Sequence, residues 1–171
     1  MSGHRFDATI LREYDIRGIV DETLSIEDAR AIGRAFGTMV VENGGKTVCV
    51  GYDGRLSSPV FEDAVVEGIV ACGLTAVRIG LGPTPMLYYA VNVVPADAGL
   101  MISGSHNPPE YNGFKMMMGK GPFYGDDIRR LGTIAGDGAY ASGEGTSVEK
   151  PVFDDYVARL ARDYIGGKEL K

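Results

Sequence analysis

Short apolar runs alternate with helix-like segments along the first 135 residues, and this alternation restricts the fold more than any other feature. Strand-like runs are expected over 46–52, 75–79, 98–103 and 113–118. Helix-like segments are expected over 25–43, 58–73, 83–94 and 126–134. Strands that alternate with helices usually form a parallel sheet with helices on both faces. Because only nine residues separate the last two runs, those two are expected to pair as an antiparallel ribbon.

The alternation predicts an α/β fold, a three-layer α/β/α domain with a mixed, mostly parallel sheet. Local signals support the helices. Ser25 with Asp28 three residues later is typical of a capping box. Ser58 is predicted to cap the next helix, with Pro59 as its first residue.

The composition divides the chain into three parts. Residues 1–135 carry the α/β/α pattern, and the serine-containing loop described below belongs to this part. Residues 136–150 are rich in Gly and Ser and lack apolar periodicity, which is typical of an exposed linker. Residues 151–171 resume helical spacing, and this helix either packs back on the domain or leads toward a second domain.

Charge and composition exclude several functional classes. A formal net charge of −6 argues against a nucleic-acid partner. No apolar run approaches the roughly 20 residues of a membrane helix, so no membrane partner is expected. Two cysteines do not make a disulfide framework, and the N-terminus leads into no apolar signal segment. A cytoplasmic location is therefore the expectation.

The segment from Ser103 to Lys115 combines side chains that carry chemistry. It follows an apolar run, so it lies where open α/β sheets place their ligand sites. Gly104 allows a sharp turn, and Pro108-Pro109 fixes the exit of the loop. Each polar residue taken singly fits a loop that only satisfies its own backbone groups, whereas the block as a whole favours a functional site.

Four segments together resemble the α-D-phosphohexomutases, the family of phosphoglucomutase and phosphomannomutase. Residues 103–115 resemble the family's active-site serine loop, Thr-(Ala/Gly)-Ser-His-Asn-Pro followed by Asn-Gly-(Phe/Ile)-Lys, with Ser103 at the threonine position. Residues 14–18 (YDIRG), 51–57 (GYDGRLS) and 84–90 (TPMLYYA) resemble three further family motifs in the family's order. The resemblance is to the bacterial phosphomannomutase/phosphoglucomutase branch.

The resemblance implies the N-terminal domain of an enzyme that interconverts hexose 1-phosphate and hexose 6-phosphate, with glucose or mannose as the sugar. Ser105 would carry a phosphoryl group and pass it to the substrate through a hexose bisphosphate, which also serves as activator. A phosphate oxygen on Ser105 would be one ligand of Mg²⁺. The remaining ligands would come from an Asp-Gly-Asp-x-Asp-Arg loop, which this chain lacks.

The resemblance also implies roles for the neighbours of Ser105. Lys115 and His106 are candidates for general acid/base catalysis and phosphoryl contacts, and Lys115 also for substrate binding. Asn107 is expected to orient the loop or to bind a substrate phosphate.

Two residues of the 14–18 segment complete the predicted site. Arg17 is expected to clamp a phosphate or the serine loop, as a catalytic and substrate-binding residue. Its alternative is an ion pair with Asp15 or Asp53 alone. Tyr14 is expected to line the substrate site, and its alternative is simple packing.

The expected partners are a hexose phosphate and the remaining domains of the same protein. Because the family's other domains are absent from these 171 residues, the isolated chain is expected to be inactive. Two alternatives stay open. One is a phosphoglucosamine mutase domain, and the other is a stand-alone, non-catalytic domain that binds sugar phosphates or a protein.

Overall fold

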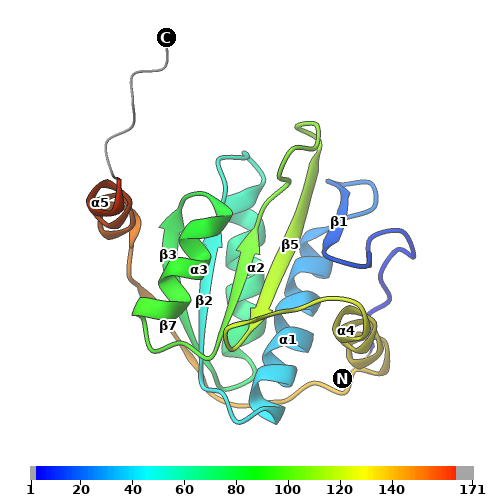
Figure 1. The fold of residues 1–171 in the computed structure, drawn as a ribbon. Coiled ribbons are helices and arrows are strands. Elements are labelled where there is room, and N and C mark those ends of the chain that lie inside the picture. The colour runs from blue at the N-terminus through cyan, green and yellow to red at the C-terminus, as the bar shows by residue number, and fades with distance from the viewer. Residues whose placement is uncertain (1–2, 165–171) are drawn as a thin grey trace.

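A seven-stranded sheet forms the middle layer of the structure, a computed structural model that describes residues 3–164 (Figure 1). The strands are β1 (Ile16–Ile19), β2 (Thr47–Tyr52), β3 (Thr75–Leu81), β4 (Ala98–Ile102), β5 (Tyr111–Met118), β6 (Gly121–Pro122) and β7 (Thr146–Glu149). Their order is β1-β5-β4-β2-β3-β7, with β6 paired to β5.

The sheet is mixed and mostly parallel, as the sequence predicts. Strands β4, β2, β3 and β7 run parallel to one another. Strand β5 is antiparallel to both β4 and β1. The short connection between β4 and β5 cannot cross over the sheet, so the antiparallel ribbon is confirmed.

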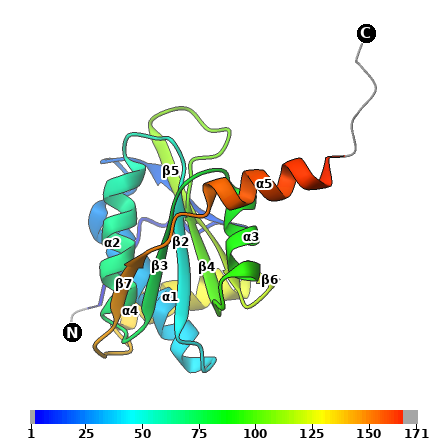
Figure 2. The ribbon, with the colours of Figure 1, turned by 90° about the vertical axis from the view of Figure 1, so that its left-hand side faces the viewer.

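Helices cover both faces of the sheet, which confirms the three-layer fold class (Figure 2). The helices α1 (Ile26–Glu42), α2 (Ser58–Val70) and α4 (Asp126–Asp137) pack on one face, where Phe36, Phe61 and Phe114 lie in the core. The helix α3 (Thr84–Val93) packs on the other face, against buried side chains that include Met101 and Met117.

The helix starts confirm one predicted cap and correct another. Ser25 and Asp28 form a complete capping box at α1. Helix α2 begins at Ser58 itself, so Ser57 is its N-cap residue and Pro59 is its second residue. The difference arises because the buried Ser58 hydroxyl donates to Oδ1 of Asp53, at 2.7 Å, instead of capping the helix.

The segment expected to be an exposed linker, 136–150, contains the edge strand β7. This strand pairs in parallel with β3, from Thr75 opposite Thr146 to Arg78 opposite Glu149. All four residues of β7 are exposed, so the strand places no side chain in the core. An edge strand of this kind needs no apolar alternation, and the sequence pattern therefore did not reveal it.

Helix α5 (Phe153–Asp163) projects from the body of the domain (Figure 2). Its start is anchored by the buried Val152, and the rings of Tyr156 and Tyr89 lie 5.7 Å apart. No residue of α5 is buried. Of the predicted segment 151–171, residues 165–171 lie outside the described residues.

Neither cysteine is in a position to form a disulfide with the other. Both are buried and free, Cys49 on the α3 side of the sheet and Cys72 on the α1–α2 side. Within residues 3–164, no helix has both the length and the apolar character needed to cross a membrane.

A buried carboxyl group links α2 to β3 and β7. Glu62 is 4% exposed and its carboxylate pairs with the guanidinium of Arg78 on β3. Arg78 also contacts Asp63 at 2.7 Å and Glu149 at 3.7 Å, so these carboxylates share one cation. Burial raises the pKa of Glu62 to about 7, and the attraction of Arg78 offsets only part of this effect.

Glu62 therefore gives the stability a predictable dependence on pH. A carboxyl group with a raised folded-state pKa holds its proton better in the folded chain. Its contribution to the free energy of unfolding then declines as pH rises from about 4.5 to about 7. Urea unfolding of Glu62→Gln and wild type at pH 5 and pH 8 measures this decline. Relative to wild type, the free energy of unfolding of Glu62→Gln should be higher at pH 8 than at pH 5 by on the order of 2–3 kcal/mol. An equal difference at both pH values would contradict the prediction.

Candidate active site

The carboxyl ends of two parallel neighbours, β2 and β4, meet at one edge of the sheet. The loop of residues 53–57 follows β2, and the loop of residues 103–110 follows β4. We call the second loop the serine loop. The backbone N–H of Asp53 donates to the carbonyl of Ile102, which ties the two strand ends together. The site predicted from the sequence thus lies at the strand ends, where open α/β sheets bind ligands.

Ser105 occupies a strained position in the serine loop. Its φ is +53°, in the left-handed region that a serine rarely adopts. Its backbone N–H donates to the Ser103 hydroxyl at 3.0 Å, so the serine at the family's threonine position supplies the expected hydroxyl. The Ser105 Oγ lies 3.3 Å from Nδ1 of His106, and both side chains are exposed.

Strand β1 brings Arg17 to the serine loop. Because β1 pairs with β5, Arg17 lies opposite Gly113. One terminal nitrogen donates to Oδ1 of Asn107 at 2.9 Å, and the other pairs with Asp15. The side chain is only 11% exposed, and its buried Nε has no hydrogen-bond partner. Arg17 therefore forms the ion pair with Asp15 and also contacts the serine loop through Asn107.

Lys115 completes a cavity of about 280 Å³ beside Ser105. The cavity is lined by Asp15, Arg17, Thr84, Pro85, Tyr88, Ser103, Ser105, Phe114 and Lys115. Lys115 points to the α3 side of β5, whereas its neighbours Phe114 and Met116 point into the opposite core. Two cationic residues thus line one cavity together with a serine, an arrangement suited to a phosphate.

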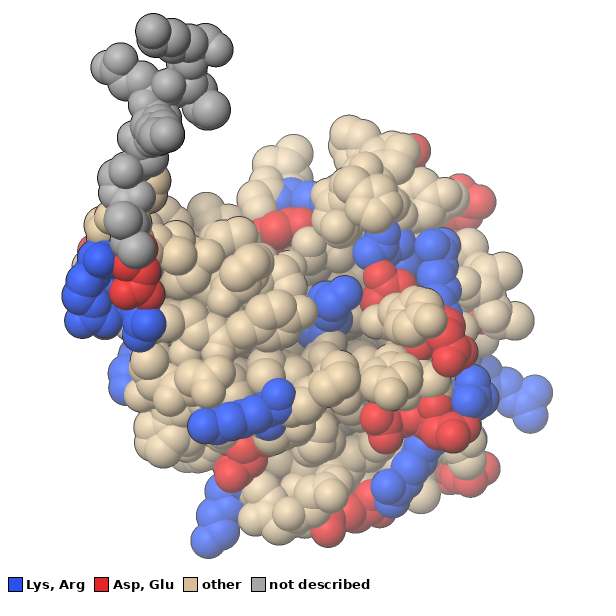
Figure 3. Space-filling model, viewed as in Figure 1, with Lys and Arg blue, Asp and Glu red and all other residues tan. Residues whose placement is uncertain are grey.

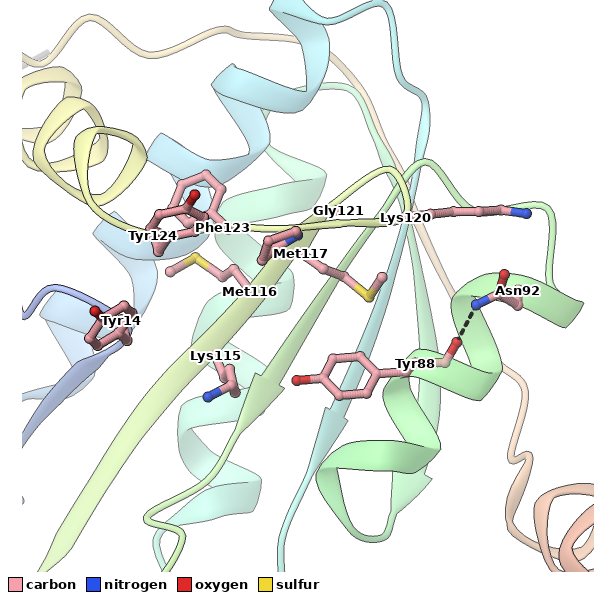
Figure 4. A pocket seen from close by; sticks show the side chains of 11 residues that line it. Tyr14, Tyr88, Asn92, Lys115, Met116, Met117, Lys120, Gly121, Phe123 and Tyr124 are labelled. Carbon is pink, nitrogen blue, oxygen red and sulfur yellow. Dashed lines mark hydrogen bonds between the residues drawn. The ribbon is translucent and has the colours of Figure 1, made fainter.

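A second cavity, of about 390 Å³, adjoins the first (Figure 4). Tyr88 and Lys115 line both cavities, and the hydroxyl of Tyr88 points toward Lys115. Tyr14 lines the second cavity, is 70% exposed, and has its ring centre 6.3 Å from that of Tyr124. The structure thus brings together Ser105, Arg17 and Lys115 and places Tyr14 next to them.

Sequence reasoning missed Tyr88 and Asn112 as parts of this site. Tyr88 belongs to the 84–90 motif, so the motif was a usable signal. Asn112 is fully buried, and its amide donates to the hydroxyls of Ser57 and Ser58. It therefore fixes the start of β5 to the loop after β2.

The surface around the site carries mixed charges. On the face that carries α3, Lys and Arg lie interspersed with Asp and Glu, mainly toward β1 and α4, while the middle is mostly uncharged surface around one basic group (Figure 3). Within residues 3–164, no group of three His, Cys, Asp or Glu side chains could hold a metal ion. The residues present therefore do not form a complete metal site.

Comparison with known proteins identifies the family. Residues 8–135 match the family description "Phosphoglucomutase/phosphomannomutase, alpha/beta/alpha domain I". The chain belongs to the phosphoglucomutase/phosphomannomutase family. This confirms the predicted resemblance, because the matched region contains all four motifs.

Individual members of the family agree with this assignment. The phosphomannomutase/phosphoglucomutase of Pseudomonas aeruginosa PAO1 is 40% identical over 96% of this chain and 35% of its own length. A probable phosphoglucosamine mutase of Thermococcus gammatolerans is 42% identical over 66% of this chain and 24% of its own length. A crystal structure of a phosphoglucomutase/phosphomannomutase family protein of Burkholderia thailandensis superposes with a TM-score of 0.87 at 39% identity, over 92% of this chain and 36% of that chain.

The chain spans about a third of the length of the curated phosphomannomutase/phosphoglucomutase relatives that it matches. The matched part is the family's domain I, which holds the serine loop in this chain.

Proposed function

We propose that this chain is the serine-bearing domain of an enzyme that interconverts hexose 1-phosphate and hexose 6-phosphate. The observation that carries the proposal is the 280 Å³ cavity that Ser105, Arg17 and Lys115 line together. The family supports the reaction class. Glucose and mannose are the proposed sugars.

In the proposed reaction, Ser105 carries a phosphoryl group that is transferred to the free hydroxyl of a hexose monophosphate. The bond between phosphorus and the Ser105 oxygen breaks as the bond to the sugar oxygen forms. The resulting hexose bisphosphate turns over and returns its other phosphoryl group to Ser105. Because phosphoryl transfer needs little covalent work from a protein, positioning and charge are the main contributions of the site.

The neighbouring side chains have matching proposed roles. Arg17, held by Asp15 and Asn107, offers a fixed positive charge to a phosphate in the cavity. Lys115 moves a proton to or from the reacting oxygen. His106, 3.3 Å from the Ser105 oxygen, is a second proton carrier, and Tyr14 lines the sugar side.

Magnesium belongs to the proposal as the counter-ion of the phosphorylated Ser105. The described residues hold no group of three His, Cys, Asp or Glu side chains that could bind a metal ion, so the carboxylate ligands would come from outside these residues. When bound, Mg²⁺ would neutralise charge on the phosphate. The proposed roles of Arg17 and Lys115 do not depend on Mg²⁺.

A phosphoglucosamine mutase is the second candidate, because one similar protein bears that name. The cavity walls described here carry no feature that selects an amino sugar over a hydroxyl sugar. A direct assay of the complete gene product with glucose 1-phosphate, mannose 1-phosphate and glucosamine 1-phosphate, each with Mg²⁺ and a trace of the bisphosphate, tests both candidates.

The proposal expects conversion of glucose 1-phosphate or mannose 1-phosphate to the 6-phosphate, and a phosphoryl group on Ser105 by mass spectrometry of the tryptic peptide. Faster conversion of glucosamine 1-phosphate would favour the second candidate. No conversion of any sugar, together with unmodified Ser105, would contradict both and favour a non-catalytic sugar-phosphate or protein-binding domain.

A further inference from the structure

The side chain of Arg55 binds the backbone of the serine loop from within the domain. One terminal nitrogen donates to the carbonyl oxygens of Pro108 at 2.6 Å and Tyr111 at 2.8 Å. The other donates to the carbonyl oxygens of Asn107 at 2.7 Å and Ser105 at 3.1 Å. A single side chain from the loop after β2 thus holds four peptide groups that lie about fifty residues further along the chain.

This arrangement depends on the shape of arginine. A guanidinium is planar and presents five N–H groups in a fixed fork, whereas an ammonium has three donors around one point. The Nε of Arg55 lies 3.4 Å from Oδ2 of Asp53, which also accepts the N–H of Gly104 at 3.1 Å. A Cβ at Gly104 would lie 2.1 Å from Nε of Arg55, so the guanidinium rests directly on this glycine.

The contacts of Arg55 bear on the strained backbone of Ser105. The Ser105 N–H is held by the Ser103 hydroxyl, and its carbonyl oxygen by Arg55. A serine with φ of +53° persists only where surrounding contacts over-determine its conformation. The two peptide groups that flank the Ser105 side chain are therefore both fixed by named contacts.

We propose that Arg55 is the positioning residue for Ser105 in the phosphoryl transfer, an inference that rests on the function proposed above. Arg55 does not line the cavity formed by Arg17 and Lys115. It acts through the serine loop, and its side chain is only 14% exposed. Its removal should therefore change the rate of the chemical step more than the binding of substrate.

Arg55→Lys in the complete gene product tests the proposal, with Arg78→Lys as the matched control. Arg78 is also a largely buried arginine with several partners, but it lies on β3, away from the serine loop. Because small misplacements of reacting groups cost up to about 100-fold in rate, Arg55→Lys should lower kcat by roughly 100-fold while KM changes less than about 3-fold. Arg78→Lys should leave kcat and KM within about 3-fold of wild type and lower only the stability.

Amide hydrogen exchange provides a readout that does not depend on activity. The N–H groups of Ser105, Asn107 and Tyr111 all donate to oxygen atoms of the serine loop. Arg55→Lys should accelerate their exchange by about 10-fold or more, because the loop opens locally, and Arg78→Lys should not. Gly104→Ala is the second variant. It keeps Arg55 but displaces its guanidinium, and it should reproduce both effects of Arg55→Lys.

The proposal would be overturned if the serine-loop amides of Arg55→Lys exchanged at the same rate as those of the wild type. Faster exchange with an unchanged kcat would also overturn it, because a mobile loop would then be harmless. If the wild-type gene product converts no hexose phosphate, the proposed function fails separately. The exchange measurement then still decides whether Arg55 holds the loop.

Discussion

Ser105→Ala is expected to lower kcat of the complete gene product by more than about 10⁴-fold, in line with the loss of a nucleophile that acts with its neighbours as a unit. The Ser105 oxygen is the proposed carrier of the phosphoryl group, and alanine has no atom to replace it. Steady-state conversion of glucose 1-phosphate measures the loss. Intact-mass analysis should show that the bound phosphoryl group is absent from the variant.

The fold should survive this substitution, so the loss of activity can be assigned to chemistry. The Ser105 side chain is exposed, its hydroxyl has Nδ1 of His106 as its one hydrogen-bond partner among the described residues, and alanine keeps a Cβ at the same left-handed position. Ser147→Ala is the matched control, because that hydroxyl accepts one hydrogen bond from Arg78 on β3, away from the site. More than a tenth of the wild-type kcat in Ser105→Ala would remove Ser105 from its proposed role.

Lys115→Met is expected to lower kcat by about 10³-fold, within the usual range for loss of a general acid or base. Methionine has similar length and no charge, and the side chain is exposed on β5 at the wall shared by the two cavities. KM for hexose 1-phosphate should change by less than about 10-fold, because Arg17 still binds the phosphate. Initial rates over a substrate series separate the two parameters.

Two further variants, Lys115→Arg and Lys120→Met, separate the effect of proton transfer by Lys115 from the effect of its positive charge. Arginine keeps the positive charge but stays protonated, so it should restore KM and leave kcat low. Lys120 lines the second cavity but not the cavity that contains Ser105, and its loss should leave kcat within about 3-fold of wild type. A rise in KM with an unchanged kcat in Lys115→Met would make Lys115 a phosphate anchor instead of a proton carrier.

The elements that the sequence predicted well are those whose signals are local. The capping box of Ser25 and Asp28 and the helix that follows are confirmed because neighbouring residues determine them. The antiparallel turn from β4 to β5 follows from the length of its connection. Strand β7 was missed because its pairing with β3 uses backbone groups that every residue has.

The candidate site divides in the same way. The block from Ser103 to Lys115 was predictable from the sequence, because its residue types fit phosphoryl chemistry. The role of Arg55 was not predictable, because nothing in its sequence neighbourhood indicates that its guanidinium donates to the carbonyl oxygens of Ser105 and Tyr111. Tyr88 lies in the 84–90 motif, which marked the segment, but only the packing of α3 on the sheet turns its hydroxyl toward Lys115.

The sequence by itself determined the α/β alternation, the mixed sheet, the serine loop and the family, because these depend on periodicity, connection length and contiguous motifs. Only the tertiary structure decided which separated groups meet: Arg17 with Asn107, Arg55 with three carbonyls of the serine loop and the carbonyl of Tyr111, and Glu62 with Arg78. The physical reason is that such contacts are set by strand order and register, which place residues 16 to 90 positions apart within hydrogen-bond distance.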